Sequence, residues 1–148
     1  KSNSKKEIIS FIEEELNNID NLQRELLECK GSNKILRRAK GSILHDFYNA
    51  CERIFEIVVH QINGIEISSP QWHKKLLYQM TIGINGIRPP VISKKLAAKL
   101  DEYLAFRHLF RNIYGFELES DRLDNLVHKF DETVKLFKKE IREFIGKL

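Results

Sequence analysis

The segment from residue 93 to residue 114 carries two arginines on a face that is otherwise apolar. Apolar residues recur there at steps of three and four, so helical winding gathers them on one side; they are Leu96, Leu100, Tyr103, Leu104 and Phe110. Arg107 and Arg111 fall inside the same arc. A guanidinium cannot lose its proton in a protein, and burying its charge alone is costly. Two interpretations stay open: a structural ion pair with an acid such as Asp46 or Glu52, or the lining of an anion-binding cleft at a helix–helix or subunit interface.

Other kinds of site lack their sequence patterns. The histidines include no pair with the spacing of a helical metal site, and no HExxH motif occurs. The chain has no glycine-rich phosphate loop and no GxSxG nucleophile elbow. We therefore predict no metal ion and no cofactor. The net charge is +4, from 25 Lys and Arg against 21 Asp and Glu, which permits RNA binding without requiring it, because phosphate binding depends on clustered charge.

The elements that must position these residues are predicted to be helices throughout. The 148 residues are expected to form one domain, 1–148. Ser4 followed by Glu7 is a capping box, which predicts a first helix that ends at residues 31–33. A second helix is predicted from Lys34 to residues 63–64.

A shorter third helix is predicted to open at Ser69 and Pro70, as N-cap and first helical residue, and to include Met80. The following GINGIRPPVIS segment cannot be a regular helix, because its glycines and paired prolines favour a structured connection with an extended stretch before the prolines.

The arginine-bearing helix is the fourth. Ser93 is its expected cap, and it should run to about Tyr114 with Gly115 as its stop. Ser120 opens a fifth helix, whose apolar face continues to Ile145. No strand alternation of useful length occurs, so the fold class is all-α, an up-and-down bundle of about five helices.

The sequence also bears on the compartment. No apolar run reaches the ~18 residues that a membrane span requires, and no signal peptide is visible. Cys29 and Cys51 have no metal-ligand spacing and are interpreted as reduced thiols. We therefore expect a cytoplasmic protein that makes no membrane contact.

Several segments of the chain resemble HEPN-domain toxins of the HepT kind. FRHLFRNIYGFEL resembles the signature of that family, which is Arg, four residues, His, one residue, Tyr. Arg107 matches the arginine and Tyr114 matches the tyrosine, whereas Asn112 stands at the histidine position. GSILHDFYNACERIFE, WHKKLLYQM and the RPP connection are similar to the HepT-like branch, so the resemblance covers roughly residues 34–145.

The resemblance implies a HEPN-like helical bundle that dimerises and cleaves RNA without a metal ion, in a cleft where two copies of the motif meet. It further implies a cognate nucleotidyltransferase antitoxin, which silences the toxin by transferring AMP to the motif tyrosine. By position, Arg107 would bind the scissile phosphate with Arg111 beside it, and Tyr114 would accept AMP. The expected partners are therefore an RNA substrate, the antitoxin and a second copy of the chain.

Asn112 departs from the signature at the residue that would transfer protons. Metal-free RNA cleavage needs one group to accept the 2′-hydroxyl proton, one to protonate the leaving 5′-oxygen, and a cation to stabilise the charge on phosphorus. An amide does not titrate, so Asn112 can only orient groups by hydrogen bonding. His108 lies one helical turn earlier and could supply the missing imidazole, or it could be a partly exposed helix residue or the partner of an acid in the second helix.

Three functions follow from these patterns. The first is an RNase toxin of a toxin–antitoxin pair. The second is a catalytically inactive HEPN module that still dimerises and binds RNA or a nucleotidyltransferase. The third is a helical interaction protein unrelated to nucleic acid. RNA cleavage without divalent metal separates the first from the other two, and salt-dependent RNA binding separates the second from the third.

Overall fold

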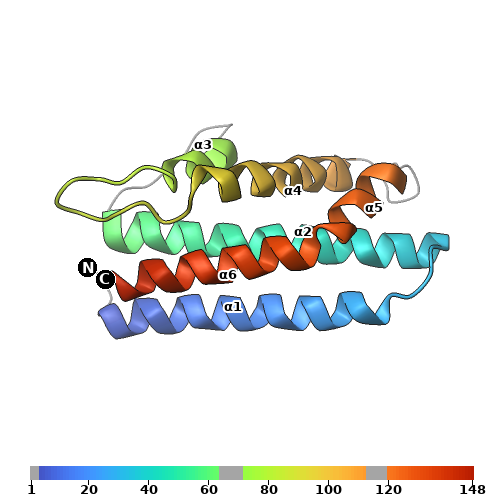
Figure 1. Ribbon diagram of the computed structural model, residues 1–148, viewed down its shortest axis with the longest axis horizontal. Coiled ribbons are helices and arrows are strands. Elements are labelled where there is room, and N and C mark those ends of the chain that lie inside the picture. The colour runs from blue at the N-terminus through green and yellow to red at the C-terminus, as the bar shows by residue number, and fades with distance from the viewer. Residues whose placement is uncertain (1–3, 64–71, 113–119) are drawn as a thin grey trace.

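The described part of the chain is helical apart from its connections (Figure 1). The computed structural model describes residues 4–63, 72–112 and 120–148. Its elements in chain order are α1 (Lys5–Glu28), α2 (Lys34–Ile57), the π-helix η1 (Val58–Asn63), α3 (Trp72–Gln79), α4 (Lys94–Asn112), α5 (Ser120–His128) and α6 (Phe130–Gly146). Over these residues the β structure is limited to one isolated bridge between Ile84 and Arg88. The predicted all-α class is confirmed.

Four long helices alternate in direction, as an up-and-down bundle requires. α1 and α4 run from the end that holds the two termini toward the opposite end, and α2 and α6 return (Figure 1). α2 packs against α1, α3, α4 and α5, so it is the central helix. The burial pattern of α2 agrees with this central position, because its buried side chains cover most of its circumference rather than one narrow stripe.

The predicted start signals are used as helix caps. The Ser4 hydroxyl accepts a hydrogen bond from the Glu7 amide at 3.2 Å, and the Glu7 carboxylate accepts one from the Ser4 amide at 3.0 Å. At the start of α4, the Ser93 hydroxyl accepts from the Leu96 amide at 3.1 Å and donates to Glu140 of α6 at 2.8 Å. The second contact joins the first turn of α4 to α6. The predicted cap at Ser69 and Pro70 lies outside the described residues.

The expectation of one continuous fifth helix was wrong. The chain breaks at Lys129 into α5 and α6, which meet at an angle (Figure 1). The backbone carbonyl of Leu126, which would serve the next helical turn, accepts a hydrogen bond from the Tyr103 hydroxyl of α4 at 2.8 Å. Tyr103 is buried, and this contact draws the end of α5 onto α4. A tertiary hydrogen bond thus bends residues 120–146, although apolar residues recur there at helical spacing without interruption.

The connection after α3 is pinned by a buried arginine. Arg88 donates hydrogen bonds to Asn63 Oδ1 at 2.8 Å and to the backbone carbonyls of Ile82 and Gln79 at 2.8 and 3.2 Å. Burial lowers the pKa of the Arg88 guanidinium from its ordinary value. Gly86 makes the turn with a φ of 77°, where a side chain would be strained. The predicted structured connection is confirmed, and it fixes where α4 begins. Within the described ranges, no helix is long and apolar enough to cross a membrane.

Candidate functional site

The core of the bundle positions the motif arginine. Tyr103 packs edge-on against Phe47 of α2, with ring centroids 5.3 Å apart, and Phe47 also contacts Phe130 of α6 at 5.0 Å. This aromatic cluster fixes the rotation of α4 about its axis. Arg107 lies one turn after Tyr103, so it faces α2 as well, and only 3% of it is exposed. The predicted burial of Arg107 on the apolar face is confirmed.

The Arg107 guanidinium is held by three residues of α2. Nη1 donates to Glu52 Oε1 at 3.0 Å and to Asn49 Oδ1 at 2.6 Å, while Nη2 donates to Glu52 Oε2 at 3.3 Å. The guanidinium carbon lies 5.0 Å from the centre of the Tyr48 ring, in cation–π range. Burial raises the pKa of the Tyr48 hydroxyl far above its ordinary value, and the Glu52 charge adds to the rise, so Tyr48 stays neutral. The ion pair between Arg107 and Glu52 thus forms within one copy of the chain and does not need a second subunit.

His73 of α3 completes this cluster. Its Nδ1 lies 2.8 Å from Glu52 Oε2 and 3.0 Å from Arg107 Nη2. Nδ1 thus faces both an acceptor, Glu52 Oε2, and a donor, Arg107 Nη2; we assign the hydrogen to Nδ1, because its contact with the carboxylate is the shorter of the two. The side chain of Glu52 is 7% exposed, whereas that of His73 is 33% exposed. Of these two residues, His73 is the one that reaches the surface.

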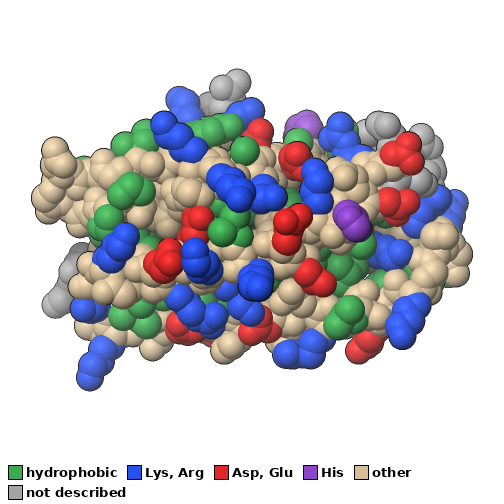
Figure 2. Space-filling view, viewed as in Figure 1, with side chains coloured by type: hydrophobic (Ala, Val, Ile, Leu, Met, Phe, Trp, Pro, Cys, Tyr) green, Lys and Arg blue, Asp and Glu red, His purple; other side chains and the backbone are tan. Residues whose placement is uncertain are grey.

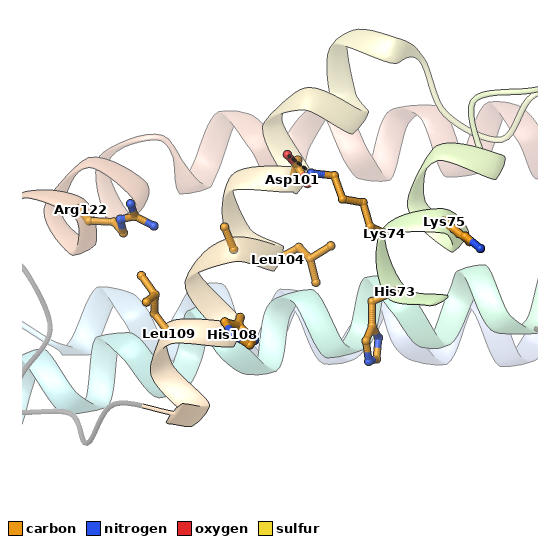
Figure 3. A pocket seen from close by; sticks show the side chains of 9 residues that line it. His73, Lys74, Lys75, Asp101, Leu104, His108, Leu109 and Arg122 are labelled. Carbon is orange, nitrogen blue, oxygen red and sulfur yellow. Dashed lines mark ion pairs between the residues drawn. The ribbon is translucent and has the colours of Figure 1, made fainter. Parts of the chain in front are cut away.

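An open cleft of about 740 Å³ lies beside the cluster, between α3, α4 and α5 (Figure 3). It combines two imidazoles, three basic side chains and an apolar floor. The residues that line it are His73, Lys74, Lys75, Asp101, Leu104, Ala105, His108, Leu109 and Arg122. Lys74 is paired with Asp101 at 3.8 Å. This composition suits an anionic ligand that also carries flat or apolar groups.

Charge is mixed on the face of the molecule that Figure 2 presents. Figure 2 shows Lys and Arg side chains interspersed with Asp and Glu over the face that it presents, without a broad patch of one sign. The net charge of +4 is therefore not concentrated on that face. Among residues 4–63, 72–112 and 120–148, no group of three or more His, Cys, Asp or Glu side chains is placed to hold a metal ion.

The structure brings together some of the predicted site residues. Arg107 and Glu52 form the pair that one of the two open interpretations required. His108 lies on the exposed side of α4 and lines the cleft. For Arg111 and Asn112 the structure describes the backbone, in the last turn of α4, but not the side chains. Tyr114 and the predicted stop at residue 115 lie outside the described residues.

Sequence reasoning missed Asn49 and His73 as members of this cluster. Both residues are far from Arg107 in the sequence: Asn49 lies 58 residues before it, and His73 lies 34 residues before it. One signal was available: both residues lie in the segments GSILHDFYNACERIFE and WHKKLLYQM, which carry the family resemblance outside the signature.

Comparison with known proteins gives one match. The model of a family described as HepT-like protein matches residues 39–148. No curated protein matches the chain, and no solved structure matches it. The matched region includes α3, α4, α5 and α6 and most of α2, which together supply Arg107, Glu52, His73 and the whole lining of the cleft. The match extends over well more than half of the 148 residues, and the chain belongs to the HepT-like protein family, which implies a HEPN-type toxin.

Proposed function

We propose that this protein is the toxin of a toxin–antitoxin pair and that it cleaves RNA as a homodimer without a metal ion. One observation carries the proposal: the motif arginine, Arg107, is buried and contacts His73, which lines a cleft together with the imidazole of His108 and exposed basic side chains. RNA cleavage through the 2′-hydroxyl requires proton transfer and positive charge, and this cleft offers groups for both.

The reaction is an attack of the 2′-oxygen on the adjacent phosphorus. The O2′–P bond forms, the P–O5′ bond breaks, and the products are a 2′,3′-cyclic phosphate and a 5′-hydroxyl. His108 transfers a proton at the cleft, Asn112 orients the phosphate or the hydroxyl by hydrogen bonding, and Arg111 adds positive charge. The exposed side chain of His108 and its place in the cleft lining support its part.

Arg107 has a part that depends on Glu52. Because Nη1 and Nη2 both donate to Glu52, a phosphate that binds these two nitrogens as a bidentate ligand must displace that carboxylate. Glu52 then still accepts from His73 Nδ1, so its charge keeps a partner. In the resting protein the pair holds the Arg107 side chain in one place, in contact with His73 of the cleft.

Silencing and assembly follow the family resemblance. We assign Tyr114 as the acceptor of AMP from the cognate nucleotidyltransferase antitoxin, since it stands at the tyrosine position of the family signature. The added anion would compete with the RNA phosphate for Arg107 and Arg111. A symmetric dimer through α4 would bring two copies of the motif together in one isologous contact.

A second candidate function is an inactive HEPN module that dimerises and binds RNA or a nucleotidyltransferase. Two observations favour it: Asn112 stands where the signature has a proton-transferring histidine, and the Arg107 guanidinium is occupied by Glu52 and Asn49. Such a module binds RNA in a salt-dependent way but leaves it intact.

The test is incubation of the purified protein with a mixed RNA in EDTA, together with sedimentation velocity at micromolar concentration. The proposal predicts cleavage and a dimer. Binding without cleavage would favour the second candidate, and a monomer that neither binds nor cleaves RNA would remove both.

A further inference from the structure

His73 lines the cleft and is held by defined contacts, but the reaction described above gives it no role. It reaches from α3 into the space between α3 and α2, on the opposite side of Leu104 from His108 (Figure 3). Its ring lies against that of the neighbouring Trp72, with centroids 3.9 Å apart and the planes tilted by 34°. The imidazole is therefore held from two sides, by Trp72 and by the buried Glu52.

Assignment of the Nδ1 hydrogen to the 2.8 Å contact with Glu52 decides which nitrogen of His73 can react. A hydrogen on Nδ1 that is donated to Glu52 leaves Nε2, across the ring, with a lone pair. A buried carboxylate that orients an imidazole and stabilises its protonated form is the arrangement that makes histidine an effective general base. In the protein without RNA, two donations from Arg107 also hold the Glu52 carboxylate in place.

We infer that His73 is the general base of the proposed RNA cleavage, oriented by Glu52, and that His108 is the general acid. This inference rests on the proposed function and names the proton-transfer groups that replace the histidine missing at position 112. In the reaction, His73 Nε2 takes the 2′-hydroxyl proton as the O2′–P bond forms. The imidazolium of His108 gives a proton to O5′ as the P–O5′ bond breaks. Solvent then returns each imidazole to its starting state.

The positions of His73 and His108 in the cleft suit their roles as base and acid. His73 and His108 approach the same cleft from different helices, with the apolar side chain of Leu104 between them (Figure 3). An in-line displacement places the attacking and leaving oxygens on opposite sides of phosphorus, so base and acid must also come from two sides. The cations of Lys75 and Arg122 line the same cleft, where they can neutralise the backbone of the RNA.

The experiment separates base from acid by changing the leaving group. Two RNA substrates are compared in EDTA, one normal and one with sulfur in place of the bridging 5′-oxygen at a single linkage. A thiolate leaves without being protonated, so the sulfur substrate does not need the acid. The proteins are the parent, His73→Asn, His108→Ala and His128→Ala.

His73→Asn keeps a donor at the position of Nδ1, so the contact with Glu52 is preserved while Nε2 is lost. His128 is an exposed histidine of α5 outside the cleft lining and is the matched control. Thermal unfolding of each variant shows whether the fold is intact.

The inference predicts that His73→Asn loses about 10²-fold or more of the cleavage rate on both substrates. His108→Ala should lose a similar factor on the oxygen substrate and regain near-parent rates on the sulfur substrate, and His128→Ala should match the parent on both. Folded His73→Asn that cleaves both substrates at the parent rate would overturn the inference while leaving the proposed function standing, and so would an exchange of the two patterns. Absence of cleavage by the parent would instead remove the proposed function, and this inference with it.

Discussion

Arg107 of α4 and Glu52 of α2 are joined inside the protein by two contacts, Nη1 to Oε1 at 3.0 Å and Nη2 to Oε2 at 3.3 Å. Both side chains are almost wholly buried, at 4% and 7% exposure. The pair therefore does two things at once. It joins the motif helix to the central helix of the bundle, and it presents the carboxylate that orients His73.

The first prediction concerns the energy of this pair. Removing one partner of a buried ion pair leaves an uncompensated charge, which typically costs about 3–5 kcal/mol. Arg107→Met and Glu52→Gln should each lower the free energy of unfolding by about that amount, and the double variant by clearly less than the sum. Urea denaturation measures all three.

The neighbouring residue of α2 provides the control for that cycle. Arg53 donates to Glu15 at 2.7 and 3.0 Å, and the two side chains are 49% and 15% exposed, so this pair is more open to solvent than that of Arg107 and Glu52. Arg53→Met should cost about 0–1 kcal/mol, because solvent screens the pair. Additive losses in the Arg107 and Glu52 cycle would contradict the coupling that the contacts require.

The second prediction compares two buried tyrosine hydroxyls. Tyr103 donates to the Leu126 carbonyl, whereas the Tyr48 hydroxyl has no hydrogen-bond partner among the described residues. Tyr103→Phe should lower the free energy of unfolding by about 0.5–1.5 kcal/mol, the net contribution of a hydrogen bond. Tyr48→Phe should be neutral or stabilising, since it removes a buried polar group and keeps the ring under Arg107. Equal losses in both variants would show that Tyr48 has a partner.

Much of the fold is predictable from local sequence. Helix starts at Ser4 and Ser93 follow from short-range hydrogen bonds, and the burial of Arg107 follows from its place in the period of α4. The break at Lys129 is not local, because it depends on Tyr103, 23 residues before its acceptor Leu126. No pattern within residues 120–145 contains that information.

The candidate site divides in the same way. Helical spacing placed Arg107 on the buried face and suggested Glu52 as one of two acids that could pair with it. Arg107 and His73 both contact one oxygen of Glu52, and this depends on how α3 packs on α2 and α4. Helical spacing within each segment does not predict that packing.

The third prediction concerns Asn112. If His73 and His108 supply both proton transfers, a new imidazole at position 112 adds little. Asn112→His should then change the rate of RNA cleavage by far less than the 10²–10⁴-fold that a general acid or base contributes. Initial rates in EDTA measure the effect. A gain of that full size would show that the parent lacks a working imidazole and would favour the inactive-module function.

The fourth prediction concerns silencing at Tyr114. With ATP and the cognate nucleotidyltransferase, the protein should gain the mass of AMP. RNA cleavage should then fall, because the proposal has the new anion compete with the RNA phosphate for Arg107 and Arg111. Tyr114→Phe should gain no such mass. Tyr78→Phe is the matched control, since Tyr78 is an exposed tyrosine of α3. AMP transfer to Tyr114→Phe at the parent rate would place the acceptor elsewhere.

The central claim is that the 2′-hydroxyl of RNA is the nucleophile and that no metal ion is needed. The most direct measurement uses one end-labelled RNA and the same RNA with a single 2′-deoxy nucleotide at the cleaved linkage, both incubated with the protein in EDTA. We predict fragments ending in 2′,3′-cyclic phosphate from the first RNA, no cleavage of the second at that linkage, and no cleavage of either by Arg107→Lys that retains the parent fold. Cleavage of the deoxy linkage, or cleavage that EDTA abolishes and added divalent metal restores, would contradict the account.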